Sequence, residues 1–247
     1  MTDLEKKKFE LLCEAERRFC DEMIGVGIGT YGEKSIHRIF KSFFSGEKSL
    51  CEAPVGTYIA DILDGDRITE IQTGSFKPLI PKLRYYLEET DCRVRVVKPL
   101  IVNKTIIRID KESGEVLRKR RSPVAEDERE LMAQLYHVGD LFKHERLEFL
   151  AVLISAEEHR YSERMRYRRE GAYDGRLFPT ALTDIITFSD ISAFEGYLPP
   201  ESCFSAKEYS AFIGRKGRAV YSILNFLCSV DVLERKKDGK RYIYYRR

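Results

Sequence analysis

Three polar side chains in the stretch 58–75, Asp61, Glu70 and Gln72, are of types that could do chemistry together. Short apolar runs flank turn formers at 64–66, which is typical of a β-hairpin. Because side chains alternate along strands, Asp61 is predicted to face Glu70 across the hairpin, with Gln72 on the same face as Glu70. A carboxylate inside an apolar strand is costly unless its charge is compensated, and a divalent cation would do that. The alternative is that both carboxylates are ordinary solvent-facing residues.

The order of residue types, an Asp, a turn and then Glu-x-Gln, resembles the PD-(D/E)XK phosphodiesterase superfamily with its restriction-endonuclease-like fold. The resemblance implies that Asp61 and Glu70 bind Mg²⁺ (or Mn²⁺). Ala60 replaces the usual proline, and Gln72 replaces the usual lysine that activates water or holds the scissile phosphate. Glutamine carries no positive charge and takes no proton, but its amide can orient a water or a phosphate oxygen. Some active restriction enzymes of the superfamily share this Glu-x-Gln variant.

A helix is predicted over 32–44, because apolar residues from Ile36 to Phe44 recur at helical spacing. Glu33 lies in its first turn. In the superfamily the helix before the hairpin often carries a Glu that reaches the metal, so the resemblance implies this role for Glu33. The alternative is that Glu33 only interacts favourably with the positive end of its helix.

The elements after the hairpin predict the sheet that positions these residues. A helix is expected over 76–88, with Lys77, Lys82 and Arg84 facing outward. A β-branched strand at 93–102, a second hairpin around 111–114 and a buried strand at 147–155 follow. A strand–helix–strand crossover of this kind gives a mixed sheet flanked by helices, so the expected fold class is α/β.

Composition sets the broad class. With 247 residues, 43% hydrophobic and 34% charged, the chain is expected to form one large or two modest globular domains. The six cysteines form no CxxC pair and do not cluster with the histidines, which favours reduced thiols over a zinc site. No signal peptide and no apolar run of spanning length is recognised, so we expect a cytoplasmic protein without membrane contact.

Two cationic stretches have two readings each. The run 118–121 (Arg-Lys-Arg-Arg) suits either a solvated turn or contact with a DNA backbone. In 160–176, arginines interleave with Tyr161, Tyr167 and Tyr173, a pattern that suits phosphate and base-stacking contacts or a linker.

The C-terminal part is predicted to be a compact unit. Helical character is expected over 181–197, a capping box opens a short helix at Ser205, and a second helix covers 215–229. A hairpin with an Asp-Gly turn follows, and its segment 234–247 holds seven cations against two anions. Helix, turn, helix and basic hairpin resemble a winged helix, in which the second helix enters the DNA major groove. Winged helices also serve as protein-interaction modules. The implied DNA-binding residues are Arg215, Lys216, Arg218, Arg235, Lys236, Lys237, Lys240 and Arg241.

These features divide the chain into a nuclease-like domain (1–159), an Arg/Tyr-rich linker (160–180) and a winged-helix domain (181–247). The expected function is that of a Mg²⁺-dependent DNA endonuclease, hydrolysing phosphodiester bonds at Asp61, Glu70, Gln72 and Glu33. Cleavage of both strands would favour a homodimer. The main alternative is a catalytically silent nuclease-like protein that binds DNA or regulates, which Gln72 keeps open. RNA as the substrate is the third possibility.

Overall fold

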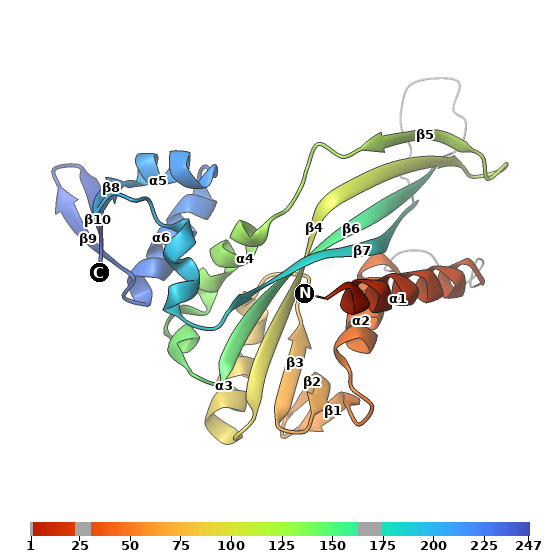
Figure 1. Ribbon diagram of the computed structural model, residues 1–247, viewed down its shortest axis with the longest axis horizontal. Helices are drawn as coiled ribbons and strands as arrows, with labels where there is room; N and C mark the ends of the chain where they lie inside the picture. The colour runs from red at the N-terminus through yellow and green to blue at the C-terminus, as the bar shows by residue number, and fades with distance from the viewer. Residues whose placement is uncertain (1, 23–30, 163–173) are drawn as a thin grey trace.

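A computed structural model describes residues 2–22, 31–162 and 174–247 (Figure 1). The α-helices are α1 (Asp3–Glu22), α2 (Tyr31–Phe44), α3 (Ile80–Glu89), α4 (Glu128–Gln134), α5 (Ala206–Ile213) and α6 (Arg218–Ser229). The strands are β1 (Leu50–Val55), β2 (Tyr58–Asp64), β3 (Arg67–Ile71), β4 (Arg93–Asp110), β5 (Val116–Arg121), β6 (Leu147–Ser162), β7 (Asp174–Phe188), β8 (Cys203–Ser205), β9 (Leu233–Asp238) and β10 (Arg241–Arg246). Short 3-10 helices are η1 (Lys77–Leu79), η2 (Leu135–His137), η3 (Gly139–Lys143) and η4 (Ile191–Tyr197).

Seven strands of the described residues form one mixed sheet in the order β1-β2-β3-β4-β6-β7, with β5 paired to β4. Neighbouring strands from β1 to β3 are antiparallel, β3, β4 and β6 run parallel, and β6 and β7 are antiparallel. Helix α3 connects the parallel strands β3 and β4, as parallel strands require a crossover. The predicted α/β class with a mixed sheet flanked by helices is therefore confirmed.

Helices cover both faces of this sheet (Figure 1). Apolar side chains of α1 and α2, among them Phe9 and Phe40, pack with Ile62, Val97 and Val152 on one face. On the other face, α3 and α4 pack over a second apolar cluster that is rich in aromatic rings. The helical spacing of the apolar residues in α2 follows from this packing, since one side of the helix is buried against the sheet.

The C-terminal unit contains α5, α6 and a separate three-stranded sheet in the order β8-β10-β9. Ser205 and Glu208 form the predicted capping box, and Gly214 ends α5 in the left-handed conformation (φ 65). The turn between β9 and β10 contains Gly239, also at positive φ, as the Asp-Gly signal predicts.

This unit shares a hydrophobic core with the large sheet. The fully buried ring of Phe226 on α6 lies 5.3 Å from both Phe142 and Phe194, measured between ring centroids. Phe142 in turn stacks on Phe149 of β6 at 5.9 Å. The two parts are therefore joined by apolar packing as well as by the chain.

The structure corrects the predicted boundaries. Residues 160–162 and 174–180, expected in a linker, lie in β6 and β7, while 163–173 fall outside the described residues. Residues 181–197, expected to be helical, continue β7 to Phe188 and then form the 3-10 helix η4. The β-branched and aromatic residues of this segment pair with β6, so packing between strands decided the outcome.

Two further expectations change in the same half of the sheet. The predicted strand at 93–102 continues to Asp110 as β4, with a register shift against β6 between Ile101 and Asn103. The cationic run 118–121 is the end of strand β5 and not a turn, and its side chains are exposed, while its alternative reading as a DNA contact stays a prediction. None of the described helices combines the length and the apolar character needed to span a membrane.

Candidate active site

The candidate site lies where β2 and β3 separate. The two strands pair from Asp64 and Arg67 only as far as Ile62 and Thr69. Beyond that point β2 continues alongside β1, whereas β3 continues alongside β4. Asp61 and Glu70 are the next residues along the two strands, so both carboxylates lie at the opening of a fork.

Asp61 is held by donors from the neighbouring strand and from α2. Its Oδ2 accepts a hydrogen bond of 2.8 Å from the backbone N–H of Ile71, which bridges the fork. Its Oδ1 lies 3.2 Å from Nζ of Lys41, which also contacts Glu52 at 2.8 Å. Burial lowers the pKa of Lys41, but the hydrogen bond to Glu52 and the charge of Asp61 outweigh it, so the pKa is raised overall. Lys41 therefore stays charged beside Asp61.

Glu70 is almost completely buried, with 3% of its surface exposed. Its Oε2 lies 2.6 Å from Nζ of Lys82, and its Oε1 accepts a hydrogen bond of 3.2 Å from the Tyr86 hydroxyl. Burial raises the pKa of Glu70 to about 7, although Lys82 acts in the opposite direction and the charge of Asp61 adds to the rise. Burial and the Glu70 charge likewise raise the pKa of Tyr86, which keeps this phenol as a donor.

Gln72 and Lys98 complete the end of β3. The backbone N–H of Gln72 bonds to Val97 of β4, and its side-chain Nε2 donates to the Ser75 carbonyl at 2.7 Å. Lys98 is buried, and its Nζ donates to the Thr73 carbonyl and, at 2.8 Å, to the Gly74 carbonyl. A lysine ammonium thus holds the loop that follows Gln72.

The predicted third carboxylate is not placed with these groups. Glu33 lies in the first turn of α2, but its side chain is outside the described part of the chain. Among described residues, no group of three or more His, Cys, Asp or Glu side chains is arranged to hold a metal ion. The donor chemistry of Asp61 and Glu70 nevertheless fits Mg²⁺, which prefers oxygen ligands and is commonly bound through one or two carboxylates with several waters.

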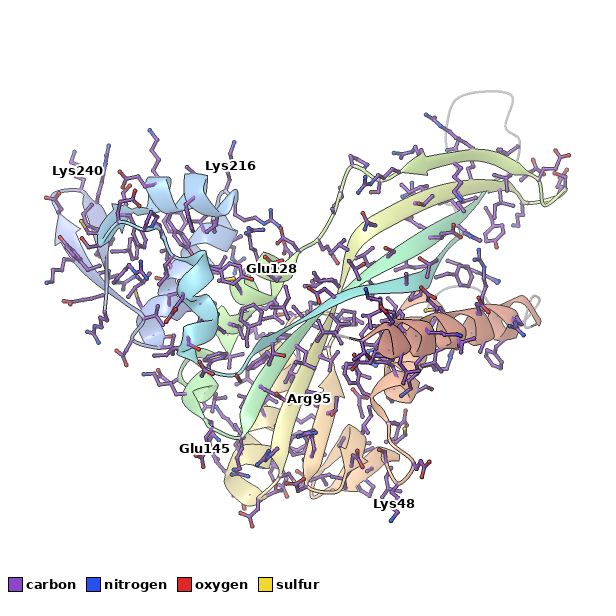
Figure 2. All side chains as sticks on the ribbon, in the orientation of Figure 1. Lys48, Arg95, Glu128, Glu145, Lys216 and Lys240 are labelled. Carbon is purple, nitrogen blue, oxygen red and sulfur yellow. The ribbon has the colours of Figure 1, made fainter. Side chains whose placement is uncertain are left out.

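The predicted DNA-binding residues are mostly exposed. Lys216 and Lys240 both project outward from the C-terminal unit (Figure 2). Arg235 donates to Asn225 of α6 at 3.0 Å and lies over the Tyr242 ring, joining the β9–β10 hairpin to the helix. The other exposed members of the set are Arg218, Lys236, Lys237 and Arg241.

Arg215 differs from the rest of that set. Its guanidinium lies 2.6 Å from the carboxylate of Asp127, the residue before α4, and 3.9 Å from that of Glu130 in α4. This arginine is half-buried and contacts the large domain, so it helps to dock the C-terminal unit.

Four side chains at the site were missed as functional candidates: Lys41, Lys82, Tyr86 and Lys98. Lys82 was expected to face outward, but its side chain turns to Glu70 and is 19% exposed. The sequence offers one usable signal for Lys98, since a charged residue interrupts the apolar run of β4 as Asp61 interrupts that of β2. Lys41 and Tyr86 carry no such signal, because helix periodicity does not show which residues reach a neighbouring strand.

Comparison with known proteins yields one match. A family model described as "Domain of unknown function (DUF8091)" matches residues 34–188, the region from α2 to the end of β7. No curated protein matches the chain. No solved structure matches it either.

Proposed function

The chain belongs to this family of domains of unknown function, and from the fork between β2 and β3 we propose that it is a Mg²⁺-dependent phosphodiesterase that cleaves DNA. One observation carries the proposal: the buried carboxylate of Glu70 lies beside that of Asp61 where β2 and β3 separate, and burial raises the pKa of Glu70 to about 7. Strongly perturbed groups of this kind concentrate at functional sites, because burying a carboxylate otherwise costs stability.

The arrangement of elements supports the restriction-endonuclease-like fold. A helix (α2), three antiparallel strands (β1 to β3), a crossover helix (α3) and a parallel strand (β4) follow one another along the chain. The Asp lies on the middle strand and the Glu-x-Gln begins on the third, as the resemblance implies. Lys41 of α2 and Lys82 of α3 reach the two carboxylates at the fork.

In the proposed mechanism Asp61 and Glu70 would hold Mg²⁺, with Glu33 as the predicted third carboxylate. A bound ion would supply positive charge to the phosphate and would lower the pKa of a water molecule. Gln72 orients that water or a phosphate oxygen through its amide oxygen, since its amide nitrogen donates to Ser75. Lys41 and Lys82 hold the two carboxylates in place when the ion is absent.

The C-terminal unit is proposed to be a winged helix that positions the DNA. The pairing of α5 with α6, followed by the basic β9–β10 hairpin, supports this reading. The exposed cations of the hairpin would contact the phosphate backbone, and α6 would present Arg218 and Lys216 near its first turn. Arg215 keeps its contact with α4 instead.

A second candidate function has its own supporting observation. Each of the four carboxylate oxygens of Asp61 and Glu70 already has a protein donor or cation within 3.2 Å. Lys41 and Lys82 thereby supply the positive charge that a metal would supply. With Gln72 in place of the usual lysine, the site could be a structural remnant in a DNA-binding or regulatory protein.

Metal binding and cleavage separate the two candidates. Wild type, Asp61→Asn and Glu70→Gln are compared for thermal stabilisation by Mg²⁺ and Mn²⁺ and for nicking of supercoiled plasmid. Both substitutions keep side-chain size and remove the negative charge, replacing one acceptor oxygen by a donor NH₂ group. If the proposal holds, wild type gains several degrees at saturating metal and nicks the plasmid, and both variants lose both properties.

Glu148→Gln is the matched control, because Glu148 is paired with Arg95 in the same sheet but lies on β6, which is separated from β3 by β4. It should keep metal stabilisation and nicking. Equal stabilisation of wild type and both fork variants, with no nicking by any of them, would favour the silent protein.

A further inference from the structure

Four arginines from three adjacent strands line one pocket in the long half of the large sheet. They are Arg108 of β4, Arg118 and Arg120 of β5, and Arg160 of β6, with Ile106 as the fifth lining residue. The pocket has a volume of about 140 Å³. Its β4 residue Arg108 is ten positions after Lys98, which lies beside the carboxylate fork. The pocket is therefore separate from the fork.

The strand register places these arginines in a row. Arg118 is directly opposite Arg108, and Arg108 is directly opposite Arg160. Directly opposite residues in a sheet share a face, and neighbouring strands lie about 4.8 Å apart, so the row spans roughly 10 Å. Arg120 belongs to the next row on that same face, opposite Ile106.

The residues described as lining the pocket are four arginines and one isoleucine. None of the described lining residues is acidic. The nearby carboxylate of Glu158 accepts a hydrogen bond from Arg160 at 2.7 Å and lies 3.2 Å from Lys104, so two cations already share it.

Guanidinium groups bind phosphates through paired N–H donors, and Arg is favoured wherever such two-point contacts are needed. Four of them across about 10 Å suit more than one phosphate at a time. Arg118 and Arg120 are exposed, so a long ligand can reach them along the sheet edge. We infer that this arginine pocket binds successive backbone phosphates of a nucleic acid.

The inference depends on the proposed function only for the identity of the polyanion as DNA. Cleavage is not needed for it to hold, because the pocket and the fork use different residues.

Strand β5 provides a control within the same six residues. Lys119 and Arg121 project from its other face, where Lys119 lies 3.4 Å from Glu157 and Arg121 donates to Asn103 at 2.6 Å. Arg118→Gln/Arg120→Gln and Lys119→Gln/Arg121→Gln therefore remove equal charge from one exposed edge strand, on opposite faces. Neither pair touches the hydrophobic core.

Binding of a fluorescein-labelled DNA duplex is measured by anisotropy in EDTA, across a series of salt concentrations. The pocket variant should bind about tenfold more weakly than wild type at ~100 mM salt, and its salt slope should fall by about 2. The opposite-face variant should stay within about twofold of wild type at the same salt. Equal weakening by both variants, or by neither, overturns the inference.

Competition identifies the source of the phosphates. Inorganic pyrophosphate is added to the same assay and is also titrated alone by calorimetry. Weak competition, with DNA binding still dependent on the pocket, supports the backbone site. Tight pyrophosphate binding that requires Arg118 and Arg120, with DNA affinity unchanged by their loss, overturns it in favour of a small diphosphate ligand. Because EDTA removes metal, failure of plasmid nicking contradicts the proposed hydrolysis and leaves this binding result intact.

Discussion

At the scale of single residues, the fork pairs two carboxylates that are neutralised in different ways. Asp61 keeps partial solvent access and receives a backbone N–H from Ile71. Glu70 is enclosed, and its ion pair with Lys82 does not fully offset the cost of removing its charge from water. Glu70 is therefore the group at this site whose protonation responds to pH near neutrality.

The first prediction concerns that response. Burial and the charge of Asp61 raise the pKa of Glu70 to about 7, above the value of 4.5 for an unfolded chain. Between these values the folded state binds more protons than the unfolded state, so ionisation of Glu70 costs stability as pH rises from 4.5 to about 7. Glu70→Gln removes this loss. The unfolding free energy of the variant relative to wild type should increase by about 3 kcal/mol across the window and then level off.

Urea unfolding of both proteins between pH 5 and 8 measures this difference. A difference that does not change with pH would show that Glu70 titrates as it does in the unfolded chain.

The sequence identified Asp61 and Glu70 as candidate site residues but did not identify the side chains that contact them. Asp61 and Glu70 stand out because a charge interrupts an apolar strand, and that signal is local. Lys82 looked like an outward helix residue, and its contact with Glu70 depends on how α3 crosses the sheet. Such contacts between distant elements follow from packing angles that a single sequence does not specify.

At the scale of elements, the turn between β1 and β2 fixes the strand that carries Asp61. Gly56 in this turn has a φ of 58, and a side chain there would collide with the ring of Tyr85 on α3. Tyr85 packs against Tyr58 at 5.3 Å and lies next to Tyr86, the donor to Glu70. The β1–β2 turn therefore packs against the crossover helix α3, and α3 in turn contacts Glu70 at the fork through Tyr86.

The second prediction compares two glycines. Gly56→Ala should lower the unfolding free energy by about 3 kcal/mol, since left-handed strain and displacement of Tyr85 add together. Gly65 has a φ of 57 but open space around it. Gly65→Ala should therefore cost only about 1 kcal/mol, from backbone strain alone. Denaturant unfolding measures both, and equal losses would show that contact with Tyr85 does not matter.

Local signals predicted elements well where the chain supplies its own caps and turns. The capping box at Ser205 and the glycine that ends α5 are confirmed because both act within a few residues. The segment 181–188 was misread as helix because its apolar residues also fit a helical period, and its pairing with β6 is long-range. The linker prediction is wrong for 160–162 and 174–180 for the same reason, while 163–173 lie outside the described residues.

At the scale of the whole molecule, the C-terminal unit and the large sheet share one hydrophobic core. We therefore expect the two parts to unfold together. Phe226, Phe142 and Phe194 form the centre of that core, and each is at most 1% exposed. Polar contacts such as Arg215 with Asp127 lie at its edge. A separate domain behind a linker was predicted because composition does not show which apolar residues meet across the boundary.

The third prediction tests this coupling. Phe226→Ala should cost about 3–5 kcal/mol through loss of buried area and the cavity left behind. Its melting temperature should fall by roughly 10 °C in a single transition. Hydrogen exchange should accelerate in β6 as well as in α6. Phe212→Ala, which changes a 46% exposed ring on α5, is the control and should cost less than about 1 kcal/mol.

A result in which α6 alone loses protection, with β6 unchanged, would show that the two parts unfold independently.

Strand β4 connects the two candidate sites. Lys98 beside the fork and Arg108 in the pocket belong to this one strand, whose pairing with β6 shifts register between Ile101 and Asn103. Ten residues at the usual rise place them roughly 33 Å apart. Because side chains alternate along a strand with a period of two residues, an amino acid inserted between Asn103 and Arg108 would turn Arg108 to the opposite face and remove it from its row with Arg118 and Arg160.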